Sequence, residues 1–107
     1  MSNPSSPVHR LVIYRPKAGK LADLEAIVRQ HGSALRKVGL ITDEPVRVYR
    51  GTDLRKPEAG TFLVETFQWR DGSAADVAHQ TPDVMAVWET MGPHLEGMTL
   101  TTLESLV

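Results

Sequence analysis

The sequence predicts an α+β domain in which strands and helices follow one another in the order β-α-β-β-α-β. Three observations predict this order: four runs of strand character, two segments with the helical period of three to four residues, and turn residues between them. With 107 residues, of which 41% are hydrophobic, the chain has the size and composition of one domain with one core.

The first half of the chain is expected to form a strand, a helix and a second strand. Residues 8–15 (VHRLVIYR) are rich in β-branched and aromatic residues, which favour a strand. In residues 20–38 apolar side chains recur every three or four positions, and Gly39 is suited to end a helix there. Residues 45–50 (PVRVYR) form the second expected strand, and the polar, Gly- and Pro-containing loop 51–60 follows it.

The second half repeats the pattern. Residues 61–69 (TFLVETFQW) give the strongest strand signal of the chain, and a short helix is expected over residues 74–80. A second amphipathic helix over residues 82–91 starts with a proline, which is favourable at the first helical position because the missing N–H needs no partner there. Residues 98–107 (MTLTTLESLV) alternate as a strand does.

This order is the split β-α-β pattern of a ferredoxin-like domain with a four-stranded antiparallel sheet. We expect residues 1–7 (MSNPSSP) to be a disordered N-terminal tail, because they are polar and rich in Pro and Ser. Residues 8–107 are then expected to form the single domain.

Composition and spacing exclude several classes of function. The 12 Lys and Arg against 13 Asp and Glu argue against nucleic acid as a partner. The absence of cysteine excludes disulfides and thiolate chemistry, and the four histidines at positions 9, 31, 79 and 94 have no metal-site spacing, so we expect no metal. No run of about 18 apolar residues or signal-peptide pattern is present, so no membrane contact is expected and the predicted location is the cytoplasm.

Both faces of the predicted sheet are apolar. In the first strand Val12 and Tyr14 point to one face while Leu11 and Ile13 point to the other, and residues 61–69 are apolar on both faces in the same way. Two helices of these lengths cover one face only, and an exposed apolar face of that size is unusual in a monomer. The sequence therefore predicts a homodimer formed through the sheet faces, and a different protein on the same face is the alternative.

Over residues 8–105 the chain resembles the antibiotic biosynthesis monooxygenase (ABM) domains of the dimeric α/β-barrel superfamily. The likeness lies in the element order, the length and the segment ETFQWRDGSAADVAHQTPDVMAVWE. In such domains a third strand that ends in an aromatic residue is followed by a short helix, a histidine, a Ser/Thr-Pro-like step and an amphipathic helix. Here Trp69, His79 and Thr81 with the proline after it match these places.

The resemblance implies a dimeric α/β barrel with a pocket between each sheet and its helices. It also implies an oxidoreductase that needs no cofactor, a monooxygenase acting on a small aromatic, quinol or polyketide-type substrate. A haem-degrading branch of the superfamily has a first-strand Asn and a haem-ligating His in its second helix. This chain has Glu89 where that His would fall, and its only Asn is Asn3, which argues against haem degradation.

Five residues are candidates for the site. His79, at the junction of two helical segments, is the candidate proton acceptor, with capping or packing of that junction as the alternative. Trp69 could stack on a flat substrate, and Tyr14 or Tyr49 could donate a hydrogen bond to its oxygen. Trp88, on the apolar face of the last helix, is a further candidate for substrate binding, although core packing is the stronger interpretation for it.

The remaining histidines are expected to be structural. His31 lies on the apolar helix face and is expected to be partly buried with a hydrogen-bond partner, His9 to face the proposed dimer side, and His94 to be exposed. For the whole protein, the alternative to a monooxygenase is a non-catalytic dimer that binds a small hydrophobic ligand or serves in a stress response. An isomerase or decarboxylase is a third possibility.

Overall fold

The computed structural model describes residues 5–107 and consists of one sheet with helices packed against it. The strands are β1 (Val8–Pro16), β2 (Arg47–Thr52), β3 (Thr61–Trp69) and β4 (Leu95–Leu103). The helices are α1 (Leu21–Lys37), α2 (Ala74–Ala78) and α3 (Pro82–Met91), with 3₁₀ turns at Pro57–Ala59 and Gly92–His94. The predicted fold class is confirmed, with α2 and α3 forming the second helical segment. Residues 1–4 of the predicted tail lie outside the described residues.

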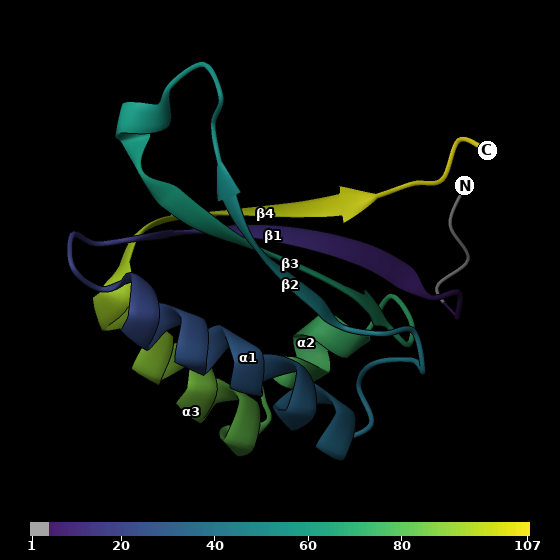
Figure 1. Ribbon diagram of the computed structural model, residues 1–107. Coiled ribbons are helices and arrows are strands. Elements are labelled where there is room, and N and C mark those ends of the chain that lie inside the picture. Colours follow the sequence, from purple (N-terminus) through teal and green to yellow (C-terminus); the bar gives the residue numbers. More distant parts are fainter. Residues whose placement is uncertain (1–4) are drawn as a thin grey trace.

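The four strands form one antiparallel sheet in the order β2-β3-β1-β4. This is the ferredoxin-like arrangement, in which the first and third strands are central. Figure 1 shows α1, α2 and α3 on the same side of this sheet; on the opposite side only the short 3₁₀ turn of the β2–β3 connection is seen. One face of the sheet therefore belongs to the core of this chain, and the other face is open.

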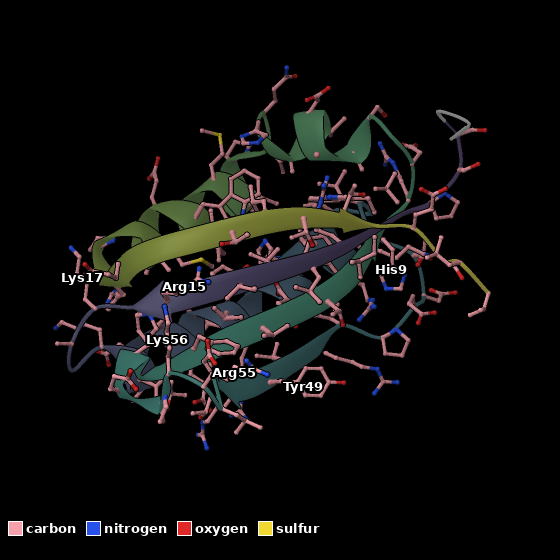
Figure 2. The ribbon with its side chains drawn as sticks, turned by 90° about the horizontal axis from the view of Figure 1, so that it is seen from above. His9, Arg15, Lys17, Tyr49, Arg55 and Lys56 are labelled. Carbon is pink, nitrogen blue, oxygen red and sulfur yellow. The ribbon has the colours of Figure 1, made fainter. Side chains whose placement is uncertain are left out.

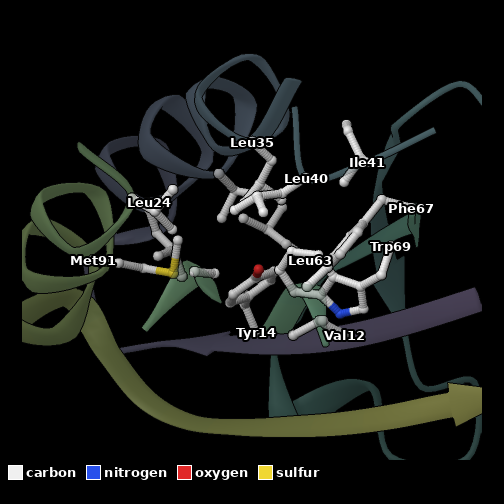
Figure 3. Close-up of a cluster of buried hydrophobic side chains, with 14 residues drawn as sticks. Val12, Tyr14, Leu24, Leu35, Leu40, Ile41, Leu63, Phe67, Trp69 and Met91 are labelled. Carbon is white, nitrogen blue, oxygen red and sulfur yellow. The ribbon is translucent and has the colours of Figure 1, made fainter. Parts of the chain in front are cut away.

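The core lies between the sheet and the helices. In β1 and β3 alternate residues are buried, as the period of two predicts: Val12 and Tyr14 on one strand, and Leu63, Phe67 and Trp69 on the other. The rings of Phe67 and Trp69 meet edge to face with centroids 4.9 Å apart. Figure 3 shows these side chains with the leucines of α1 packed against them.

The predicted boundaries agree with the structure for the third strand and the last helix, and they differ by one residue at each end for the first helix. The predicted helix over 20–38 is found at Leu21–Lys37, and Gly39 follows it with a φ of 73°, a left-handed conformation that favours glycine. The last strand was predicted too late in the sequence. It begins at Leu95 directly after a 3₁₀ turn and ends at Leu103, because Leu103 pairs with His9 at the start of β1 and later residues have no strand beside them.

The open face carries apolar side chains from the central strands. Leu11 and Ile13 of β1 and Phe62 and Val64 of β3 are partly exposed there, and the register places Val64 beside Ile13. Tyr49 of the edge strand β2 pairs with Val64 and is 51% exposed. Figure 2 looks onto the sheet from above and shows Tyr49 at its edge.

Candidate functional site

A cavity of about 370 Å³ lies between the sheet and the helices. Its walls come from β1, β3 and β4 on one side and from α1, α2 and α3 on the other, and most of the lining side chains are apolar or aromatic. Because Met98 and Leu100 of β4 line it and are still exposed, the cavity opens beside β4. A mostly apolar hollow of this size with a few polar groups is typical of a site for a small molecule.

A buried carboxylate lies behind the cavity wall and is hydrogen-bonded to two of the residues that line the cavity. Glu65 occupies the middle of the inward face of β3, between Val12 of β1 and Val48 of β2, and it is completely buried. The hydroxyl of Tyr14 donates a hydrogen bond to Glu65 Oε1 over 2.6 Å. His31 Nδ1 lies 2.9 Å from Oε1 and 3.0 Å from Oε2 of the same carboxylate. These partners satisfy a charge that would be costly to bury alone.

The hydrogen bonds of His31 define which of its nitrogens carries the proton. Nε2 lies 2.9 Å from Trp88 Nε1, and an indole N–H can only donate, so Nε2 must accept. Nδ1 must then hold the proton and donate it to Glu65. His31 is therefore a neutral imidazole with Nδ1 protonated, and the chain of bonds joins α3, α1, β3 and β1 through Trp88, His31, Glu65 and Tyr14.

The hydroxyl proton of Tyr14 is used in the hydrogen bond to Glu65. Burial, followed by the charge of the Glu65 carboxylate and the hydrogen bond to it, raises the pKa of Tyr14 above its usual value of 10.0. Tyr14 therefore stays protonated, and its proton is already donated to Glu65. The predicted role of Tyr14, donation to a substrate oxygen, would require that bond to be broken.

Two donors in side chains that line the cavity have no partner among residues 5–107. The indole Nε1 of Trp69 is buried and has no hydrogen-bond acceptor within residues 5–107. Arg10, which follows the same inward register as Val12, lines the cavity, and its guanidinium makes no hydrogen bond or ion pair with any other described residue. Both groups can donate to a ligand, and Arg10 also supplies a positive charge.

His79 also reaches the cavity wall but differs from His31. It follows α2 and is exposed, and its ring lies 4.7 Å from the ring of Trp88, measured between centroids. The ring of His31 lies 6.2 Å from the same indole, also measured between centroids. Trp88 thus contacts two histidines. Of these two, only His31 has a hydrogen bond within the described chain that fixes its protonated nitrogen.

The structure brings four of the five predicted site residues together. Tyr14, Trp69, His79 and Trp88 all line the cavity. Tyr49 does not, because its place in the register puts it beside Val64 on the open face of the sheet.

Sequence reasoning missed Glu65 and Arg10, and it gave His31 a purely structural role. One signal was present: a carboxylate on the helix-facing side of the third strand and a histidine on the apolar side of the first helix both point into the same core. The expected burial and partner of His31 are confirmed, because it is 3% exposed and bonded to Glu65.

Within residues 5–107 no group of three or more His, Asp or Glu side chains is arranged to hold a metal ion. In the same part of the chain no helix is both long enough and apolar enough to cross a membrane.

The fold is shared with several solved structures, while no protein-family model and no curated protein matches the sequence. PA3566 from Pseudomonas aeruginosa has a TM-score of 0.71 at 17% identity, covering 99% of this chain and 100% of that one. SnoaB from Streptomyces nogalater, a cofactor-independent oxygenase, has a TM-score of 0.72 at 10% identity, with 95% of each chain covered. A structure named antibiotic biosynthesis monooxygenase has a TM-score of 0.68 at 16% identity, covering 94% of this chain and 99% of that one.

These similarities define the class of fold: an α+β, ferredoxin-like domain of the kind found in antibiotic biosynthesis monooxygenases. The ferredoxin-like fold of the single chain that the resemblance implies is confirmed. At these identities the similarity concerns the fold, and the reaction has to be argued from the cavity itself.

Proposed function

We propose that this protein is a cofactor-independent monooxygenase whose cavity binds a small aromatic molecule of the quinol or polyketide type. The observation that carries the proposal is the indole N–H of Trp69, a side chain that lines the apolar cavity: this N–H is buried and has no acceptor within residues 5–107. A buried donor without an acceptor costs about 1–3 kcal/mol. A substrate oxygen that accepts from Trp69 removes this cost, so the cavity favours a flat molecule that carries a carbonyl or phenolic oxygen.

The charge of Arg10 supports the same substrate class. Its guanidinium lies on the cavity wall with no anionic partner among residues 5–107. Where a bound ligand displaces water from the cavity, such a cation stabilises a substrate that has lost a proton, because a lower dielectric strengthens the attraction. Trp69 and Arg10 together would hold the anion through its oxygen.

The proposed reaction uses dioxygen as the oxidant and the substrate as the source of electrons. A side chain accepts a proton from an activated methylene or phenol, and the resulting anion transfers an electron to dioxygen. For a methylene between two aromatic rings, the carbon keeps one oxygen atom as a ketone. The other oxygen atom leaves as water with the two hydrogens of the methylene.

This function predicts oxygen consumption with anthrone, a small aromatic ketone with such a methylene. We expect the purified protein to consume one dioxygen per anthrone under air, without added flavin or metal. Trp69→Phe should weaken anthrone binding about tenfold, since one hydrogen bond to the substrate is lost. The same change should alter the free energy of unfolding of the free protein by about 1 kcal/mol or less, because it also removes a buried unpaired donor while shrinking the ring.

An oxygen electrode and denaturant unfolding measure these two effects. If Trp69→Phe binds anthrone as well as the wild type does, the proposed hydrogen bond between Trp69 and the substrate is wrong. Tight binding of anthrone with no oxygen consumption would favour the alternative function, a non-catalytic protein that binds a small hydrophobic ligand. The SnoaB similarity favours the oxygenase, because that protein of the same fold is a cofactor-independent oxygenase.

The function also requires a group that accepts the substrate proton. The sequence predicts His79 for this step, and that remains a prediction. The cavity wall offers a second histidine, His31, and the oxygenase proposal holds with either one.

For the assembly we propose a homodimer through the open sheet face. Its support is the apolar strip formed by Leu11, Ile13, Phe62 and Val64, which no helix of the described chain covers. A stable interface of about 800 Å² per subunit would hide this strip, and two-fold pairing of identical faces is the commonest way to do so.

A further inference from the structure

We propose that His31, held by Glu65, is the residue that accepts the substrate proton, at Nε2, and that Trp88 occupies this position until a ligand arrives. The ligand class is therefore a weak acid with an O–H or activated C–H group that can replace the indole N–H. This inference rests on the proposed function, since the proton comes from a molecule bound in the cavity.

The geometry leaves Nε2 as the only nitrogen of His31 that can accept. Both oxygens of Glu65 lie within 3.0 Å of Nδ1, so the carboxylate keeps the proton of the imidazole on that side. The lone pair of Nε2 then points at the donor 2.9 Å away, Trp88 Nε1. Since both rings line the cavity, a small movement of the indole exposes this lone pair to a ligand.

The carboxylate makes the transfer electrostatically favourable. Before transfer the buried group consists of an anionic Glu65, a neutral His31 and a neutral ligand. After transfer it consists of the same anion, an imidazolium and a ligand anion, so the total charge is unchanged. The imidazolium still donates Nδ1–H to Glu65, at the short distance where opposite charges attract most strongly.

Tyr14 keeps the carboxylate in place during this step. Its hydroxyl donates to Oε1, and its raised pKa keeps that proton on the phenol. Glu65 therefore has two fixed donors, one from β1 and one from α1, which orient it toward His31 in the way that a carboxylate orients the histidine of a catalytic pair.

Trp88 suits the role of a replaceable donor. It is partly exposed on α3, so its N–H can bond to water when it leaves Nε2. His79 lacks the comparable support: its ring touches Trp88, it is exposed, and among the described residues no hydrogen bond orients it. These differences favour His31 over His79 as the proton acceptor.

The test measures ionisation of bound anthrone in the absence of oxygen, using the absorbance of its anion, with occupancy measured by equilibrium dialysis. In wild-type protein at neutral pH we expect the bound probe to ionise. In His31→Gln the ionised fraction at equal occupancy should fall about tenfold or more. Glutamine can still donate to Glu65 and accept from Trp88, which limits the effect on folding, and a thermal unfolding curve checks this.

Three further variants complete the design. His94→Gln is the matched control, because His94 lies outside the cavity lining and bonds to the carbonyl oxygen of Thr90, and it should ionise the probe as the wild type does. His79→Gln should retain the ionised fraction. Trp88→Phe, which cannot donate to Nε2, should bind the probe several-fold more tightly.

The proposal is overturned if wild-type protein leaves the bound probe neutral, or if His31→Gln ionises it as fully as the wild type does. In the second case, loss of ionisation in His79→Gln would assign the step to His79. The oxygenase proposal fails separately. If ionisation of the probe depends on His31 but no oxygen is consumed, His31 remains the proton acceptor and the oxygenase proposal is wrong. If His31→Gln consumes oxygen as fast as the wild type, the protein is an oxygenase and His31 is not its proton acceptor.

Discussion

Replacing Glu65 with alanine is expected to lower the free energy of unfolding by about 3 kcal/mol. The change leaves the Tyr14 hydroxyl and the His31 Nδ1–H without their acceptor in a site that water does not reach, and it opens a cavity between α1 and β3. Relief of the buried charge offsets only part of this loss. A small domain has a total stability of about 5–15 kcal/mol, so the shift in denaturant midpoint should be large.

Two companion variants make this result specific. Glu65→Gln keeps the volume, and its carbonyl oxygen in the place of Oε1 can still accept from both donors. It loses the charge and puts an NH₂ donor in the place of Oε2, beside the protonated His31 Nδ1, so we expect roughly half of the loss seen with alanine. Glu89→Ala removes a carboxylate from the exposed side of α3 and should change stability by about 0.5 kcal/mol or less. A loss below about 1 kcal/mol for Glu65→Ala would mean that the network contributes little to the fold.

The second large effect is expected at the open sheet face. Ile13 lies near the middle of this face, between Val64 and Thr99 on the neighbouring strands. In a dimer that buries this face, Ile13→Lys would place an unpaired charge in the interface, which costs several kcal/mol. We expect the dissociation constant to rise at least about 100-fold, so that the variant sediments as a monomer of 11.8 kDa at micromolar concentration.

The control for this experiment carries the same new charge elsewhere. Leu54 is 92% exposed in the connection between β2 and β3, and Leu54→Lys should sediment as the wild type does. If the wild-type protein is itself a well-behaved monomer at this concentration, the homodimer is wrong and the open face needs another explanation.

The order of the elements could be predicted from the sequence because it depends on local patterns. The helical period, the strand alternation and the glycine after α1 each report on a few neighbouring residues, and these predictions lie within a few residues of the structure. The ends of β4 could not be read in this way. They depend on where β1 begins and ends, because a strand stops where its neighbour does.

The polar network depends on contacts that no local pattern reports. His31 and Glu65 are 34 residues apart in sequence, and Tyr14 and Glu65 are 51 apart. The sequence pattern predicts which face of its helix or strand each of these residues occupies. The hydrogen bonds between them can be predicted only when the positions of the helix and the strands relative to one another are known. The prediction that Tyr49 belongs to the site is wrong for the same reason. The register of β2 against β3 puts Tyr49 on the face of the sheet opposite the cavity, and the sequence of β2 alone does not show this register.

The hydrogen bonds of His31 require a neutral imidazole that is protonated at Nδ1, beside Glu65, with the lone pair of Nε2 directed at Trp88 Nε1. A long-range proton–nitrogen correlation NMR spectrum of the protein labelled with ¹⁵N-histidine tests this directly, with the His31 signals assigned from their loss in His31→Gln. At neutral pH we expect a protonated Nδ1 and an unprotonated Nε2 for this residue. A proton on Nε2, whether alone or together with one on Nδ1, would contradict it.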